Sequence, residues 1–177
     1  GGIEGFSWQL WEATVIDVKG AAPAVKFKYV AADMEEGFPG KCTTVCTYSL
    51  HDDGALRIQM EATTDQRCPV NLCNHSYFNL GGHDSGSVLG MRLHLNCDRY
   101  TPSTATQIPT GELKSVAGTP FDFTTPLPNA HTLAERIDAV EDADGHDSSA
   151  SYDHNFVINT GGIQGNPSTL VECATMY

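Results

Sequence analysis

Short segments in which apolar and polar residues alternate recur along this chain. The clearest pair is Cys42–Leu50 and Ala55–Thr63, which flank the turn-forming sequence His51–Gly54. In the second segment, one set of alternate positions is apolar and the other set is polar. This period of two is typical of a strand with one face buried and the other in water. Because Asp-Gly favours tight turns, the pattern predicts an antiparallel hairpin.

The same alternation predicts further strands at Thr14–Val18, Ala24–Val30, Met91–Cys97, Asn155–Ile158 and Thr169–Ala174. Thr132 and Glu135 have capping-box spacing, which predicts one short helix from Leu133 to about Val140. The acidic segment Glu141–Ser151 is expected to be a surface loop. Many short strands, with no repeat and no boundary between domains, predict an all-β sandwich or barrel. We expect residues 1–177 to form a single domain.

The segment Pro69–Leu80 contains most of the side chains suited to binding a polyhydroxylated ligand. It begins with strand-like alternation, and at a period of two His75, Tyr77 and Asn79 share one face. An imidazole, a phenol and an amide together offer hydrogen-bond donors, acceptors and an apolar surface, as a sugar ring requires. The alternative is that His75 is a buried histidine whose hydrogen bonds are satisfied by a neighbour.

Asp153 is a second candidate, because polar residues there run directly into the predicted strand Asn155–Ile158. Asp153 and His154 are adjacent, so on a strand they point to opposite faces and only one can line a given pocket. A carboxylate facing a pocket can hold two sugar hydroxyls with its two oxygens. The alternative is an ordinary turn or edge residue.

The net charge and the cysteine content argue against several kinds of partner and site. The net charge is −12, with only 10 Lys and Arg, which disfavours nucleic acid and anionic membranes as partners. No apolar run approaches the roughly 20 residues that cross a bilayer. The six cysteines include no Cys-x-x-Cys motif, so we expect reduced structural thiols and a cytoplasmic location. The remaining histidines show no spacing of metal ligands.

Several motifs, in the same order, resemble those of the aldose 1-epimerase (galactose mutarotase) family, and together they extend over essentially the whole chain. They are Gly1-Gly2 with Phe6 and Trp11, Gly37–Gly40, Val45–Leu50, Pro69–Leu80, Tyr100–Pro102, Ile108–Glu112, Gly118–Phe123 and Tyr152–Val157.

The resemblance implies a large antiparallel β-sandwich of the galactose mutarotase type. It also implies an enzyme that interconverts the α and β anomers of free hexoses such as galactose and glucose, without cofactor or metal. By matching position, His75 would be the general acid at the ring oxygen, Asp153 would hold sugar hydroxyls, and Tyr77 would contact the sugar. The expected partner is a small aldose, and the expected assembly is a monomer or homodimer.

Two functional residues of the family have no matching position here. An early substrate-binding histidine precedes the two glycines, and the glutamate base lies beyond any counterpart of Tyr177. We therefore expect this chain to be the central part of a longer one, lacking both ends of the sandwich. The alternative function is a non-catalytic sugar-binding module or sensor on the same fold. An epimerase-like protein acting on sugar phosphates ranks last, because Lys and Arg are few.

Overall fold

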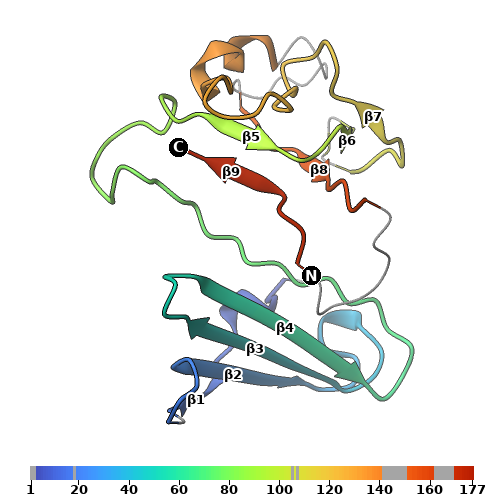
Figure 1. Ribbon diagram of the computed structural model, residues 1–177. Helices are drawn as coiled ribbons and strands as arrows, with labels where there is room; N and C mark the ends of the chain where they lie inside the picture. Colours follow the sequence, from blue (N-terminus) through green and yellow to red (C-terminus); the bar gives the residue numbers. More distant parts are fainter. Residues whose placement is uncertain (1–2, 18, 105, 107, 141–150, 162–169) are drawn as a thin grey trace. The chain divides into compact units, whose positions relative to one another are not determined.

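The computed structural model describes residues 3–17, 19–104, 106, 108–140, 151–161 and 170–177 (Figure 1). The chain divides into two compact units, Gly1–Tyr77 and Phe78–Tyr177. The prediction that residues 1–177 form a single domain stays a prediction. In both units the sheets are antiparallel, and the described helices are short 3-10 helices.

The first unit is built on a four-stranded antiparallel sheet in which sequential strands are neighbours (Figure 1). Its strands are β1 (Glu12–Ile16), β2 (Ala24–Ala31), β3 (Cys42–Leu50) and β4 (Leu56–Thr64). Two 3-10 helices accompany them, η1 (Phe6–Trp8) before β1 and η2 (Glu35–Gly37) between β2 and β3. The predicted hairpin is confirmed: Gly54 adopts a φ of 83°, and its N–H donates to the His51 carbonyl at 2.9 Å.

The pairing of the strands places apolar side chains in rows across one face of this sheet. Phe27 on β2 aligns with Cys46 on β3, which aligns with Met60 on β4. In the next row on the same face, Tyr48 on β3 aligns with Val25 and Ile58 on its two neighbours. Because residues two apart share a face, the alternation in the sequence becomes one continuous apolar surface.

An aromatic cluster at the start of the chain covers part of this surface. The ring centroids of Phe6 and Trp11 each lie 5.6 Å from that of Tyr29 on β2. The Trp11 indole N–H donates to the Phe6 carbonyl at 2.9 Å, which ties the segment after η1 back to the first residue of that helix. These contacts explain why Trp11 lies against the sheet rather than in water.

The turn between β2 and β3 contains two non-glycine residues in left-handed conformations, Met34 (φ 64°) and Glu36 (φ 51°). Hydrogen bonds hold it in this shape. The Asp33 carboxylate accepts the Gly40 N–H at 2.6 Å, and Glu35 accepts from the Tyr29 hydroxyl at 2.9 Å and from the Ala32 N–H at 3.1 Å. A left-handed backbone costs an L-residue roughly 1–2 kcal/mol, so these bonds act against local strain.

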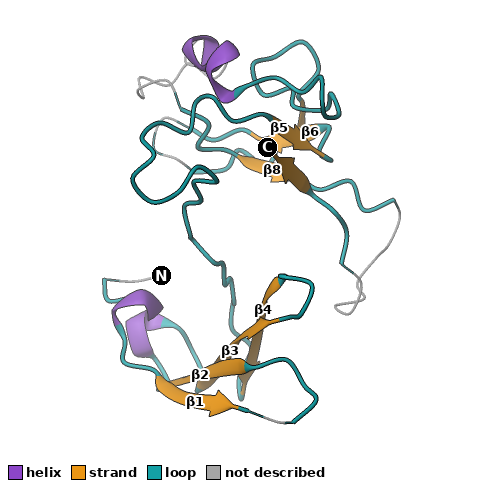
Figure 2. Cartoon of the chain, turned by 60° about the vertical axis from the view of Figure 1, so that its left-hand side comes forward, coloured by secondary structure: helices purple, strands orange, loops and turns teal. Residues whose placement is uncertain are grey.

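The second unit has two small antiparallel sheets joined by long loops (Figure 2). β5 (Leu93–Leu95) pairs with β9 (Ala174–Met176), and β6 (Arg99–Thr101) lies between β7 (Lys114–Ser115) and β8 (Asn155–Val157). Its 3-10 helices are η3 (Leu133–Glu135) and η4 (Ile137–Ala139).

Aromatic residues supply most of the core of the second unit. Tyr100 and Phe121 are fully buried with ring centroids 4.5 Å apart, and Tyr152 and Phe156 pack against the cluster that they form with Val116 and Val140. In a sheet of such short strands, this packing supplies stability that a few ladder hydrogen bonds do not provide.

Side-chain hydrogen bonds add further links between segments of this unit. The Asn96 side-chain amide donates to the carbonyls of Asn159 and Glu172, and therefore joins three segments of chain.

Several secondary-structure predictions are wrong in extent or type. The predicted helix over Leu133–Val140 is instead the pair η3 and η4, because Arg136 between them has a φ of −134°. The capping box of Thr132 and Glu135 is nevertheless present. The strand predicted at Met91–Cys97 is reduced to β5, and residues 67–79, all described, belong to no strand. β6 and β7 were not predicted.

The predicted strand Thr169–Ala174 shares only Ala174 with β9, and residue 169 lies outside the described residues. Positions 141–150 of the predicted acidic loop also lie outside them.

All six cysteines are free, which agrees with the expected thiols. Cys42 and Cys97 are buried, whereas Cys73 and Cys173 are exposed.

Hydrogen bonds around η3 fix an ionisable pair. His131 Nδ1 lies 2.5 Å from the Glu135 carboxylate, and the Arg136 guanidinium lies 2.5 Å from His131 Nε2. A guanidinium only donates, so Nε2 accepts and Nδ1 carries the proton given to Glu135. The hydrogen bond from His131, followed by those from Thr132, lowers the pKa of Glu135 from 4.5 to about 2.

Replacing Met34 by glycine should stabilise the protein, because glycine adopts a positive φ without strain. Met34 is 59% exposed, so little packing is lost with its side chain. We expect Met34→Gly to raise the free energy of unfolding by about 1 kcal/mol in chemical denaturation of the whole protein. Met34→Ala retains a Cβ and should show no comparable gain. A destabilised glycine variant would contradict the strain argument.

The lowered pKa of Glu135 predicts a pH-dependent contribution to stability. A carboxyl whose pKa is lower in the folded state stabilises above its unfolded pKa, here 4.5, and the contribution is lost as the pH falls toward 2. We expect Glu135→Gln to destabilise the protein most above pH 4.5, with the difference from the unsubstituted protein shrinking below it. Denaturant titrations at several pH values measure this. Glu112→Gln, in an exposed loop, is the matched control, and an equally pH-dependent effect there would refute the assignment.

Candidate functional site

His75 lies in the first unit, in the extended segment that follows β4, and its side chain is exposed. Its ring centroid is 5.4 Å from that of Tyr77, with the two planes inclined by 46°. The structure therefore brings these two predicted site residues together, as the period of two indicated, although the segment forms no strand. The exposed imidazole differs from the buried histidine considered as the alternative.

The amide of Asn74 holds the backbone on both sides of His75. Asn74 Oδ1 accepts the Ser76 N–H at 3.2 Å, so the side chain spans His75. Asn74 Nδ2 donates to the Tyr48 hydroxyl on β3 at 3.3 Å. The contact with Tyr48 was not predicted, because no local pattern in the sequence links residues 26 positions apart.

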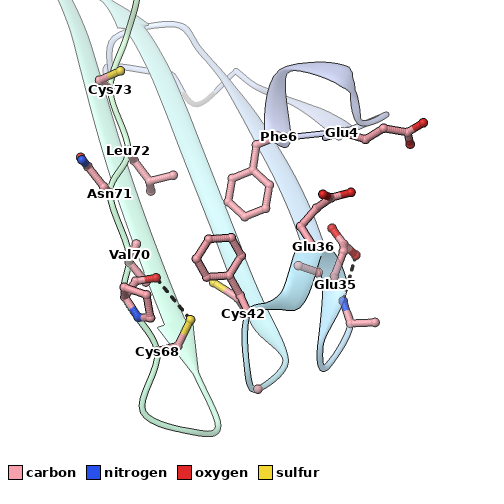
Figure 3. A pocket seen from close by; sticks show the side chains of 16 residues that line it. Glu4, Phe6, Glu35, Glu36, Cys42, Cys68, Val70, Asn71, Leu72 and Cys73 are labelled. Atoms are coloured by element: carbon pink, nitrogen blue, oxygen red, sulfur yellow. Dashed lines mark hydrogen bonds between the residues drawn. The ribbon is translucent and has the colours of Figure 1, made fainter. Parts of the chain in front are cut away.

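Two cavities lie beside this segment within the first unit. The first, of about 490 Å³, is bounded on one side by residues 68–73 and on the other by Glu4 and η2 (Figure 3). The Phe6 ring lies between these two walls in Figure 3. The second cavity, of about 670 Å³, lies on the apolar face of the sheet and is lined by Trp11, Phe27 and Tyr48. Leu72 and Cys73 line both cavities, but His75 lines neither.

Asn79, which shared the predicted face with His75 and Tyr77, has a structural role in the second unit. Its Oδ1 accepts from the Gly81 N–H at 3.0 Å and from the Ser85 hydroxyl at 3.2 Å. Its Nδ2 donates to the Gly86 carbonyl at 3.1 Å. These bonds direct the amide into the turn that follows it, and they explain why a polar side chain occurs there.

Asp153 lies in the second unit, two residues before β8, and is exposed. Its neighbour His154 points into the core, with its ring centroid 4.3 Å from that of Phe121 and 5.8 Å from that of Tyr100. Thus only Asp153 of the pair is available to a ligand, in agreement with the expected opposite orientation of adjacent residues.

The Tyr152 hydroxyl, beside Asp153, is a buried polar atom with no hydrogen-bond partner among the described residues. Burial raises the pKa of Tyr152, so its phenol remains neutral at physiological pH.

The predicted site residues therefore fall in both units. His75 and Tyr77 are together in the first unit, and Asp153 is in the second. That Asp153 shares a site with them stays a prediction. Within the described residues, no three His, Cys, Asp or Glu side chains are grouped so as to hold a metal ion. Nor is any described helix long and apolar enough to span a membrane.

The chain is similar to known proteins over nearly its whole length. Residues 1–173 match the family model described as aldose 1-epimerase. A galactose mutarotase from Sus scrofa is 38% identical over 159 residues, which cover 89% of this chain and 41% of that protein. An aldose 1-epimerase from Escherichia coli K12 is 37% identical over 162 residues, which cover 92% of this chain and 43% of that protein. The chain thus spans less than half the length of these relatives.

Two solved structures are also similar. A GalM/aldose epimerase homologue from C. elegans has a TM-score of 0.73 at 28% identity, covering 99% of this chain and 47% of that one. A galactose 1-epimerase from Lactobacillus acidophilus NCFM has a TM-score of 0.73 at 26% identity, covering 98% of this chain and 46% of that one. Together with the antiparallel sheets described above, these likenesses confirm the predicted all-β fold class of the galactose mutarotase type.

Proposed function

The chain belongs to the aldose 1-epimerase family, and on that premise we propose that it is part of an enzyme that interconverts the α and β anomers of free hexoses. The observation that carries the proposal is the family match over residues 1–173, together with relatives named galactose mutarotase and aldose 1-epimerase. Galactose and glucose are the proposed substrates. The same names favour an enzyme over a non-catalytic sugar-binding module.

The reaction requires two groups beside the sugar ring, an acid at the ring oxygen and a base at the anomeric hydroxyl. A carboxylate takes the proton of the anomeric hydroxyl while an acid protonates the ring oxygen, and the ring opens. The C1–C2 bond then rotates, and ring closure on the other face of the carbonyl reverses both proton transfers. A positioned acid or base of this kind contributes about 10²–10⁴-fold to the rate.

In this proposal His75 is the acid at the ring oxygen, since imidazole donates and accepts protons near neutral pH. The exposed His75 ring, with the Tyr77 ring 5.4 Å away, offers a proton donor beside an aromatic surface. Asp153 holds sugar hydroxyls, and the base is a glutamate with no matching position in this chain. We further propose one domain, a cytoplasmic monomer or homodimer, and catalysis without metal or cofactor.

Replacing His75 should abolish most of the activity of the whole protein that contains this chain. Polarimetry on freshly dissolved α-D-galactose measures relaxation to the anomeric equilibrium. We expect acceleration over buffer, and a loss of about 10²–10⁴-fold in His75→Ala, because the ring oxygen loses its acid. His83→Ala, at an exposed turn, is the matched control.

Two other outcomes of this experiment would contradict the proposed enzyme or the proposed role of His75. A folded protein that binds galactose without accelerating its mutarotation is a sugar-binding module, and the proposed enzyme is then wrong. If His75→Ala unfolds the protein, His75 has a structural role instead.

Asp153→Asn should weaken sugar binding, because an amide offers one acceptor oxygen where the carboxylate offers two. We expect a higher KM with a smaller change in kcat, measured by initial rates over a range of galactose concentrations. Asp138→Asn, at an exposed position on η4, serves as the control for the loss of a charge. An unchanged KM in Asp153→Asn removes this residue from the site.

A further inference from the structure

We propose that Tyr48 on β3 is a positioning residue for His75 and that it acts through the side chain of Asn74. The inference rests on the proposed function for its kinetic meaning, because it concerns the same acid. Its structural part, that Tyr48 fixes the place of the His75 imidazole, stands on contacts within the first unit alone.

A hydrogen bond joins Asn74 to the sheet. Asn74 Nδ2 donates to the Tyr48 hydroxyl at 3.3 Å. In the part of the chain that the structure describes, no other hydrogen bond joins residues 74–77 to the four-stranded sheet. Since residues 67–79 form no strand, no ladder hydrogen bonds fix their position either.

The side chain of Asn74 is also linked to the backbone around His75. The Asn74 side chain also accepts the Ser76 N–H at 3.2 Å, so it closes a small turn around the backbone of His75. An amide held at both of its ends has little freedom to rotate. The direction in which the His75 side chain leaves the backbone therefore depends on the position of the Tyr48 hydroxyl.

Tyr48 is itself held in place by its neighbours in the sheet. It lies on β3, which has hydrogen-bonded neighbours on both sides, and it aligns with Val25 and Ile58. Its ring meets the Phe27 ring edge to face, with centroids 6.0 Å apart and planes at 85°. Edge-to-face packing restricts the ring, so the hydroxyl is a fixed point on the sheet.

Such a fixed point matters because proton transfer is sensitive to distance. A general acid must come within about 2.6–3.2 Å of the atom that it protonates. A displacement of 1 Å caused by a remote substitution can cost about 10²-fold in rate. In this proposal Tyr48 touches no substrate and transfers no proton; it determines where the His75 imidazole is held.

The kinetic test compares Tyr48→Phe, Asn74→Ala and the double variant in the whole protein. Tyr48→Phe removes one hydroxyl and keeps the ring against Phe27. We expect it to lower kcat about tenfold with little change in KM, because the acid is misplaced while sugar contacts remain. If Tyr48 acts through Asn74, the double variant is no slower than Asn74→Ala alone.

Tyr29→Phe is the matched control. Tyr29 lies on β2 on the same apolar face, and its hydroxyl donates to Glu35 at 2.9 Å, so the same single atom is removed from a different contact. We expect its kcat to be unchanged. Equal kinetic losses in Tyr29→Phe and Tyr48→Phe, or additive losses in the double variant, overturn the proposal.

A readout without catalysis separates this inference from the proposed function. The His75 imidazole resonances, followed by NMR in the sugar-free protein, should change shift and broaden in Tyr48→Phe and in Asn74→Ala but not in Tyr29→Phe. If the protein does not accelerate mutarotation and the resonances still respond this way, the positioning role stands and the enzyme proposal fails. Unchanged resonances in folded Tyr48→Phe overturn the positioning role whatever the activity.

Discussion

The register of the antiparallel pairing among β2, β3 and β4 is the constraint on which the rest of the first unit depends. It places Phe27, Cys46 and Met60 in one row and Val25, Tyr48 and Ile58 in the next. A slip by one residue would turn every one of these side chains to the opposite face. The aromatic cluster of η1, the second cavity and the hydroxyl that meets Asn74 all require this face. In the proposed arrangement, the candidate acid is thus positioned by strand pairing that ends 11 residues before it in the chain.

The second unit buries its apolar residues with shorter strands and with side-chain hydrogen bonds between segments. Its strands are two or three residues long, so the fully buried Tyr100 and Phe121 and the bridging amide of Asn96 carry much of the packing. This arrangement also separates the roles of two adjacent residues. His154 is committed to the aromatic core, and Asp153 is left exposed. The exposed carboxylate therefore lies next to a residue whose ring packs in the aromatic core, just before β8 begins.

The sequence predicts those features that depend on local chemistry. The bounds of β3 and the Gly54 turn follow from alternation and turn residues, and the capping box at Thr132 is present. The helix expected after it fails because a cap specifies a start and not a length, and Arg136 leaves the helical region after one turn.

In the candidate site, too, the sequence predicts only the arrangement that depends on local chemistry. The proximity of His75 and Tyr77 follows from a period of two that holds in any extended segment. Asn79 was assigned to the same face, yet its amide is used by the turn that begins there. The bond from Asn74 to Tyr48 depends on tertiary packing, for which a single sequence gives no signal.

The order of the four-stranded sheet has a consequence for how the first unit can be handled. Within the described residues, β1 and β4 each have a neighbour on one side only. Their outer backbone N–H and C=O groups form open edges, which are templates for adding a strand from another chain. β1 exposes Val15 beside such an edge, whereas β4 displays Arg57, Gln59 and Glu61, whose charged and polar side chains discourage association. Of these two edges, β1 is therefore the more open to pairing with a strand of another chain, and Val15→Lys would oppose such pairing.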